Sequence, residues 1–232
     1  MLRLFIPILI FLTSAIASAT PPAQVSFPSA DELPVTADVY APHPSEAPTI
    51  VLFHQAGWSR GEYAEIAPML NAMGFNCIAV DQRSGEGVGG VKNQTSRAAK
   101  QKNLATRSVD ARQDTLAALR YAKSRYGRPV LACGSSYSSS LVLHIAGSEP
   151  GLVDGVLAFS PGEYFSGQGK GSRYVTEAAR KIQVPAFLTS SKSEGSSVRP
   201  IFEAVGTAKK TQFVPRTRGN HGSRALWARF DD

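Results

Sequence analysis

The chain has 232 residues, of which 43% are hydrophobic, and a formal net charge of +7. This is enough apolar sequence for one buried core, and a chain of this length is expected to form a single domain. The 20 glycines and 15 prolines are close to ordinary usage, which excludes fibrous and largely disordered proteins. Basic residues are spread along the chain without interleaved aromatic residues, so the sequence does not favour nucleic-acid binding.

The N-terminus has the pattern of a secretory signal peptide. Arg3 precedes a nearly continuous apolar run over residues 4–12, and residues 17–19, Ala-Ser-Ala, form a small-residue cleavage pattern. We therefore predict a signal peptide at 1–19, export to the periplasm or the extracellular space, and no stable membrane insertion after its removal. An uncleaved N-terminus that anchors the chain to a membrane is the alternative.

Residues 20–34 are rich in proline and polar residues and are predicted to form a leader into a domain at 35–232. Within that domain, short apolar runs alternate with helical patterns. In chain order, the predicted strands are residues 35–40, 49–53, 75–80, 129–133, 153–159, 184–189 and 211–214. The predicted helices are residues 61–73, 109–126, 136–146, 173–181 and 198–205.

Apolar strands that alternate with helices predict an α/β fold, with a mostly parallel sheet covered by helices on both faces. Strand 35–40 alternates between apolar and polar residues and is predicted to be antiparallel, at an edge of the sheet. Residues 82–107 show no clear periodicity. Two interpretations of this segment stay open: a loop on the substrate side of the sheet, and a solvated surface loop.

Cys77 and Cys133 are the only two cysteines, and each lies inside a predicted strand. Strand side chains point to fixed faces, so we expect two buried free thiols rather than a disulfide, although an exported protein permits one. No CxxC motif or Cys/His cluster is present in the sequence, and no metal site is predicted.

The strongest motif is Gly134-Ser-Ser136-Tyr-Ser138, which takes a predicted strand through a sharp turn into a predicted helix. Such a turn requires small residues two positions before and two positions after its central residue. With Ser136 at the centre these positions hold Gly134 and Ser138, whereas Ser135 would place Tyr137 there. Ser136 is therefore the predicted nucleophile, and an anion-binding turn at a helix N-terminus is the alternative.

A serine hydroxyl needs an adjacent base to act as a nucleophile. His43 lies among prolines before the core, and His54 ends an early predicted strand. His144 lies on the same predicted helix as Ser136, about 12 Å further along it. His221 follows the last predicted strand in a glycine-flanked loop that can reach the Ser136 turn, so it is the predicted base; an ordinary surface histidine is the alternative.

The acid that orients the histidine is expected in a loop after a strand. Glu194 follows strand 184–189 and is the predicted acid, with Glu163, after strand 153–159, as its rival. For both residues the alternative is an exposed loop carboxylate.

An oxyanion intermediate needs backbone N–H donors. Tyr137, the residue after the nucleophile, supplies one, and Ala56, in the loop after strand 49–53, is predicted to supply the other, with Gln55 as its alternative. His54 is expected to shape this loop. Trp58 and Tyr137 are expected to line the substrate site, with ordinary core or rim aromatics as the alternative.

Six segments together resemble α/β-hydrolases of the dienelactone-hydrolase-like group: residues 53–57, 61–63, 79–85, 134–138, 159–162 and 221–226. The resemblance extends over about residues 35–227. It implies an eight-stranded, mostly parallel sheet, hydrolysis of an ester or related acyl bond, and no metal. The chain order nucleophile, acid, histidine also agrees with this fold.

The resemblance does not extend to every position. Dienelactone hydrolase uses a cysteine nucleophile where this chain has Ser136, so the fold and the reaction class are carried over but not the substrate. The acid of the group is commonly an aspartate, whereas Ser193-Glu194 stands at the corresponding position.

The sequence thus predicts an exported serine hydrolase that cleaves a carboxylic ester or related acyl bond of a small molecule through Ser136, His221, Glu194 and an acyl-enzyme, without a cofactor. A peptidase or acyltransferase with the same three residues is one alternative. A binding protein with a degenerate hydrolase fold is the other.

Overall fold

The structure, a computed structural model, describes residues 21–127 and 129–230, so the predicted signal peptide at 1–19 lies outside the described residues. The strands of the main sheet are β1 (Ala23–Pro28), β2 (Pro34–Tyr40), β3 (Thr49–Phe53), β4 (Asn76–Val80), β7 (Val130–Ser135), β8 (Gly155–Phe159), β9 (Ala186–Thr189) and β10 (Lys210–Phe213).

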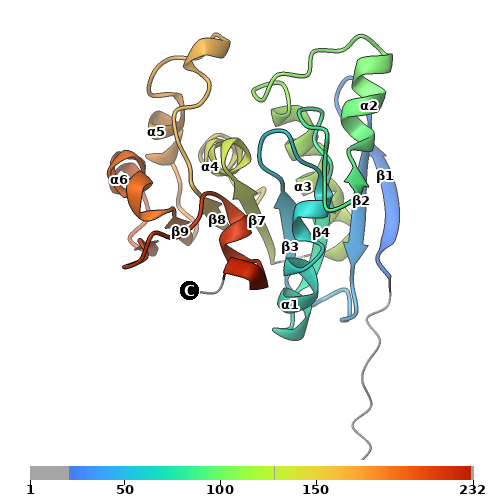
Figure 1. The fold of residues 1–232 in the computed structure, drawn as a ribbon, viewed down its shortest axis with the longest axis horizontal. Coiled ribbons are helices and arrows are strands. Elements are labelled where there is room, and N and C mark those ends of the chain that lie inside the picture. Colours follow the sequence, from blue (N-terminus) through green and yellow to red (C-terminus); the bar gives the residue numbers. More distant parts are fainter. Residues whose placement is uncertain (1–20, 128, 231–232) are drawn as a thin grey trace, which may run out of the picture.

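These eight strands form one sheet in the order β1-β2-β4-β3-β7-β8-β9-β10 (Figure 1). Strand β2 runs antiparallel to both β1 and β4, and the pairs from β4 to β10 are parallel. The predicted α/β fold with a mostly parallel eight-stranded sheet is confirmed.

The α-helices are α1 (Ile66–Ala72), α2 (Gln94–Gln101), α3 (Arg112–Tyr126), α4 (Tyr137–Ser148), α5 (Tyr174–Ala179) and α6 (Gly195–Ala204). Short 3₁₀ helices are η1 (Arg60–Tyr63), η2 (Ser166–Gln168), η3 (Lys192–Glu194), η4 (Ser223–Leu226) and η5 (Ala228–Phe230). Helix α3 places Leu116, Leu119 and Ala122 on its buried side and ends at Gly127, whose φ of 71° is easily adopted only by glycine.

Both faces of the sheet are covered, because the side chains of β3 alternate between two apolar cores. Val51 and Phe53 point into a core closed by α3 and α4, whereas Ile50 and Leu52 point into a core closed by η1 and α1. Every residue of β3 is buried, as expected for a central strand of a parallel sheet. The carboxyl ends of β3, β7, β8 and β9 therefore meet at one edge, where the predicted site residues lie.

The folded part of the chain includes most of the segment that the sequence analysis assigns to a leader. Residues 23–28 form β1, which pairs with β2 over its whole length and is the outermost strand on that side of the sheet. Phe27 of β1 is buried and stacks on Tyr121 of α3 at 4.6 Å between ring centroids. β1, rather than the predicted strand 35–40, thus forms this edge.

Residues 82–107 contain regular structure that the sequence analysis does not predict. A small hairpin of β5 (Gly87–Val88) and β6 (Val91–Lys92) leads into α2. Asn93 caps this helix by accepting a hydrogen bond from the Ser96 N–H at 2.8 Å, and the Thr95 hydroxyl accepts one from the Thr36 N–H of β2 at 2.9 Å. Helix α2 has no apolar periodicity because its buried side consists of small and hydroxyl residues.

Cys77 and Cys133 are both buried and free, which confirms the expectation of unpaired thiols. They lie on β4 and β7, which flank β3 on its two sides, so a full strand separates them. Among the described residues, every helix is too short or too polar to cross a membrane.

Candidate active site

Ser136 lies at the turn between β7 and α4, and its backbone has φ 59° and ψ −123°. A positive φ strains any residue other than glycine, and such strain is found at turns that present a nucleophile above a sheet. A Cβ atom on Gly134 would lie 2.5 Å from the backbone of Ser138, so position 134 requires glycine. The close approach of strand and helix assumed in the sequence analysis is therefore present.

Ser138 occupies the position where glycine is usual in this motif. Its hydroxyl donates to the Phe53 carbonyl at 2.7 Å and accepts from the Ser135 N–H at 2.8 Å. The hydroxyl thereby joins the ends of β3 and β7, and it satisfies two buried backbone groups. This accounts for a serine at position 138.

The structure brings Glu194 and His221 together. The Nδ1 atom of His221 is hydrogen-bonded to Glu194 Oε1. Glu194 Oε2 also accepts hydrogen bonds from the Ser160 hydroxyl at 2.9 Å and the Ser191 hydroxyl at 2.7 Å. Burial raises the pKa of Glu194, but the hydrogen bonds from His221, Ser191 and Ser160 outweigh burial, and the net effect lowers it. Glu194 is thus held as a carboxylate on the Nδ1 side of the imidazole.

The carboxylate of Glu163, the alternative candidate for the acid, binds a different part of the chain. Its two carboxylate oxygens accept hydrogen bonds from the Val175 N–H at 2.9 Å and the Thr176 N–H at 2.8 Å. Glu163 therefore binds the first turn of α5, where free N–H groups favour a carboxylate.

The two residues after His221 attach its loop to the turn that carries Ser136. The Gly222 N–H donates to the Ser160 hydroxyl at 3.0 Å, and the Ser223 N–H donates to the Ser135 hydroxyl at 2.9 Å. Ser135 immediately precedes Ser136, and Ser160 also donates to Glu194. The loop is therefore held at the carboxyl ends of β7 and β8.

The backbone hydrogen bonds of the loop after β3 distinguish the two candidate oxyanion donors, Gln55 and Ala56. The Gln55 N–H donates to the Glu62 carboxylate at 2.7 Å. The N–H groups of Ala56 and Tyr137 make no hydrogen bond within the part of the chain that the structure describes. Ala56 and Tyr137 thus have the N–H groups left to bind an oxyanion, whereas that of Gln55 is occupied.

His54 is completely buried and shapes this loop. Its Nε2 accepts a hydrogen bond from the Gln82 N–H at 3.0 Å, so the neutral ring carries its proton on Nδ1, which donates to the Gln55 carbonyl at 2.9 Å. Burial lowers the pKa of His54 and favours this neutral form. The ring connects the ends of β3 and β4.

Both aromatic residues expected at the substrate site have structural contacts. Trp58 stacks on Trp227 with ring centroids 5.1 Å apart and an interplanar angle of 2°. The Tyr137 ring is buried, and its hydroxyl donates to Gln82 Oε1 at 3.1 Å. Trp58 is half-buried, so part of its surface remains available to a ligand.

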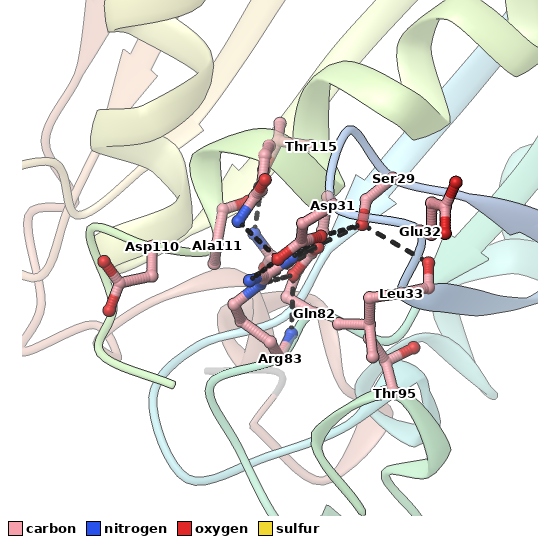
Figure 2. Close-up of polar contacts among 12 residues, drawn as sticks. Ser29, Asp31, Glu32, Leu33, Gln82, Arg83, Thr95, Asp110, Ala111 and Thr115 are labelled. Carbon is pink, nitrogen blue, oxygen red and sulfur yellow. Dashed lines mark hydrogen bonds and ion pairs between the residues drawn. The ribbon is translucent and has the colours of Figure 1, made fainter. Parts of the chain in front are cut away.

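The Gln82 side chain connects the site to a buried ionic cluster (Figure 2). Arg83 is 1% exposed and forms ion pairs with Asp114 at 2.7 Å and with Asp31 at 2.8 Å. Gln82 Nε2 donates to the Thr115 hydroxyl at 2.9 Å, next to Asp114 on α3. The cluster holds the loop after β4 in place, and the Tyr137 hydroxyl donates to the Gln82 side chain of this loop.

Two residues near the site, Ser160 and Tyr164, are not among the predicted site residues. Ser160 has a φ of 56° at the end of β8 and joins Glu194 to the His221 loop. The Tyr164 hydroxyl donates to the Ser160 carbonyl at 2.8 Å, and burial and the charge of Glu194 raise the pKa of its phenol. The only sequence signal is that Ser160 directly follows the predicted strand 153–159 and that Tyr164 lies in the same loop.

Within residues 21–127 and 129–230, no group of three or more His, Cys, Asp or Glu side chains is arranged to hold a metal ion. The described residues of the site instead provide the Ser136 hydroxyl, the His221 imidazole paired with the Glu194 carboxylate, and the unbonded N–H groups of Ala56 and Tyr137.

No protein-family model and no curated protein matches the chain. Several solved structures, however, are similar to it. An esterase from Pyrococcus furiosus is 17% identical, with 86% of this chain and 84% of that chain covered and a TM-score of 0.64. A dienelactone hydrolase from Anabaena variabilis is 15% identical, with 87% and 89% covered and a TM-score of 0.66.

An acetyl xylan esterase from Paenibacillus is also 15% identical, with 91% of this chain and 82% of that chain covered and a TM-score of 0.66. At such low identity these similarities concern the fold. The resemblance expected from the motifs is confirmed at that level, and together with the sheet order and the turn at Ser136 it establishes that the chain has the α/β-hydrolase fold.

Proposed function

We propose that this protein is a serine hydrolase that cleaves a carboxylic ester or a related acyl bond of a small molecule. One observation carries the proposal. The loop after β10 pairs His221 with the Glu194 carboxylate, and the same loop is hydrogen-bonded through Ser223 to Ser135, the neighbour of Ser136. The esterase and dienelactone hydrolase structures with the same fold support an ester substrate.

In the proposed reaction, His221 accepts the proton of the Ser136 hydroxyl while the oxygen attacks the ester carbonyl. Glu194 holds the imidazole in the required tautomer and stabilises its protonated form. The N–H groups of Tyr137 and Ala56 bind the negatively charged oxygen of the tetrahedral intermediate. His221 then gives the proton to the leaving alcohol, and an acyl-enzyme on Ser136 remains.

The second half of the reaction releases the acyl group. His221 accepts a proton from a water molecule, whose oxygen attacks the acyl carbonyl, and then returns that proton to Ser136 Oγ as the acid departs. A carboxylic acid and the free enzyme result, and atoms and charges balance without a cofactor.

The decisive variant is Ser136→Ala, which removes the attacking oxygen. We expect kcat/KM for p-nitrophenyl acetate to fall by at least about 10⁴-fold, because the remaining groups only bind and polarise the ester. A fluorophosphonate probe should label the wild-type chain and not this variant. Ser124→Ala, at an exposed serine of α3, is the matched control and should retain both properties. If Ser136→Ala retained turnover, Ser136 would not be the nucleophile.

The same assays separate the alternatives. Hydrolysis of amides, or transfer of the acyl group to an added alcohol in preference to water, would make the protein a peptidase or an acyltransferase. A chain that neither turns over esters nor reacts with the probe would be a binding protein with this fold.

We also propose that the protein is exported, on the basis of the signal-peptide pattern at residues 1–19. The exported protein is then expected to begin at Thr20, which N-terminal sequencing checks. A mature chain that retains residues 1–19 would contradict export by this route.

A further inference from the structure

The proposed mechanism gives no role to the most deeply buried carboxylate of the site. Glu62 lies on η1, directly after the loop that carries Ala56, and its side chain has no exposed surface. Removing an ionised carboxylate from water is costly unless hydrogen bonds or charges compensate. The contacts of Glu62 therefore need an explanation.

Two hydrogen-bond donors bind the Glu62 carboxylate, and they come from two different parts of the site. Oε2 accepts from the Gln55 N–H at 2.7 Å, and Oε1 accepts from the Ser223 hydroxyl at 2.6 Å. Ser223 also donates its N–H to the hydroxyl of Ser135, the residue before Ser136, at 2.9 Å. Glu62 thus connects the Ala56 loop with the His221 loop, which Ser223 attaches to the nucleophile turn.

These donors suit a carboxylate and not a carboxylic acid. The Gln55 N–H can only donate, and the Ser223 hydroxyl donates to the other oxygen. A proton on Glu62 would compete with one of these donors for its place. The carboxylate form therefore accepts both hydrogen bonds at the same time.

We propose that Glu62 is a positioning residue, which in its carboxylate form holds the Ala56 loop and the His221 loop at a fixed separation on either side of Ser135. The inference rests on the hydrolytic function proposed above. It gives a role to the segment 61–63, which resembles the hydrolases but has no part in the chemical steps. Protonation of Glu62 loosens both loops and reduces turnover.

The ionisation of Glu62 falls in an accessible pH range. Burial raises the pKa of Glu62 to about 7, although the neighbouring Ser135 hydroxyl, the hydrogen bonds from Ser223 and Gln55 and the charge of Arg224 act in the opposite direction. The other titratable groups that face it are Tyr63, Cys133 and Tyr137, and burial raises the pKa of each. None of these three loses its proton near neutral pH.

The test is Glu62→Gln, which removes the charge and keeps the shape. Glu163→Gln, the same substitution at the carboxylate that binds α5, is the matched control. For short p-nitrophenyl esters, we expect Glu62→Gln to lower kcat by about tenfold to a hundredfold and to change KM less than about threefold, because the loops that form the transition-state contacts shift. The control should leave both constants unchanged.

The pH profile of kcat distinguishes positioning by a carboxylate from a purely structural role. In the wild-type chain Glu62 must lose a proton before turnover, which adds one unit to the slope of log kcat against pH on the acid side. In Glu62→Gln this slope should be smaller by one. An unchanged slope, or kcat within about twofold of wild type, overturns the proposal.

A second variant covers the case in which Glu62→Gln does not fold. Ser223→Ala keeps the Glu62 carboxylate but removes one donor, which raises the pKa of Glu62 further. The acid side of the kcat profile should then move to higher pH. A profile that does not move contradicts the proposed role.

Thermal unfolding separates this inference from the hydrolytic function itself. Because the folded chain raises the pKa of Glu62 from 4.5 to about 7, the group favours folding below its unfolded pKa, and this contribution is lost as the pH rises through 7. As the pH rises from 4.5 to about 7, the melting temperature of the wild-type chain should therefore fall relative to that of Glu62→Gln.

If the wild-type chain neither turns over esters nor reacts with the fluorophosphonate probe, the hydrolytic function is wrong, and the comparison of melting temperatures still reports the charge of Glu62. Equal pH dependence of the two melting temperatures means that folding does not raise the pKa of Glu62, and the inference fails whatever the function.

Discussion

Single hydrogen bonds decide between residues that look equivalent in the sequence. Glu194 and Glu163 both follow a strand and both precede a helical segment. Glu194 is bound to His221, whereas Glu163 is bound to the backbone of α5. Gln55 and Ala56 are neighbours, yet only Gln55 has its N–H occupied, by Glu62. The partners of these groups come from distant segments, so no local pattern could have separated them.

The two glutamates give a direct test of the acid. We expect Glu194→Gln to lower kcat by about a hundredfold to ten-thousandfold, because the imidazole loses the group that holds its tautomer and stabilises its charge. Glu163→Gln should leave kcat within about twofold of wild type, since it changes only the cap of α5. Steady-state kinetics on the same ester measure both, and the reverse order of effects would assign the acid to Glu163.

At the scale of the elements, buried ion pairs attach segments that lack apolar faces. Arg83 holds the loop after β4 between Asp31, which precedes β2, and Asp114 of α3. Figure 2 shows Arg83 beside Asp31. Arg60 of η1 pairs in the same way with Asp38 of β2 and Asp81 at the end of β4. A buried charge that loses its partner is strongly destabilising.

We expect Asp114→Ala to lower the free energy of unfolding by about 3–5 kcal/mol, because it leaves Arg83 buried with one partner fewer. Glu203→Ala, which breaks the exposed pair with Arg199 on α6, should cost less than about 1 kcal/mol. Urea unfolding of both variants measures the difference. Equal small effects would show that the Arg83 cluster does not contribute to stability.

The elements that the sequence predicts are those with apolar periodicity. Strands β3, β4, β7, β8 and β9 are largely apolar, and each was predicted to within a few residues. Strand β1 and helix α2 were missed, because their buried positions are few or are occupied by Thr95, Ser96 and Ala99 rather than by large apolar residues. Ser136 and His221 were chosen as candidate site residues from their local surroundings, whereas Glu62 and Ser160 were not, since their hydrogen bonds join segments far apart in the sequence.

For the molecule as a whole, the folded unit begins within the proline-rich segment. A chain that begins at Thr20 keeps β1, the Phe27–Tyr121 stack and the Asp31–Arg83 pair. A chain that begins at residue 35 lacks all three and exposes the edge of β2 to pairing with other chains.

We expect the chain from Thr20 to unfold at the same temperature as the full chain, and the chain from residue 35 to unfold at a markedly lower temperature and to aggregate. Calorimetry and light scattering check the two outcomes. Equal stability of the two shortened chains would mean that β1 adds nothing to the fold.

The stacked pair of Trp58 and Trp227 has an optical consequence. These are the only two tryptophans of the chain, and their rings lie nearly parallel at 5.1 Å. The indole N–H of Trp227 also donates to the Glu62 carbonyl at 2.8 Å. All indole emission therefore originates from a single contact, between the loop of Ala56 and the C-terminal segment, so fluorescence reports movement of that loop without any added label.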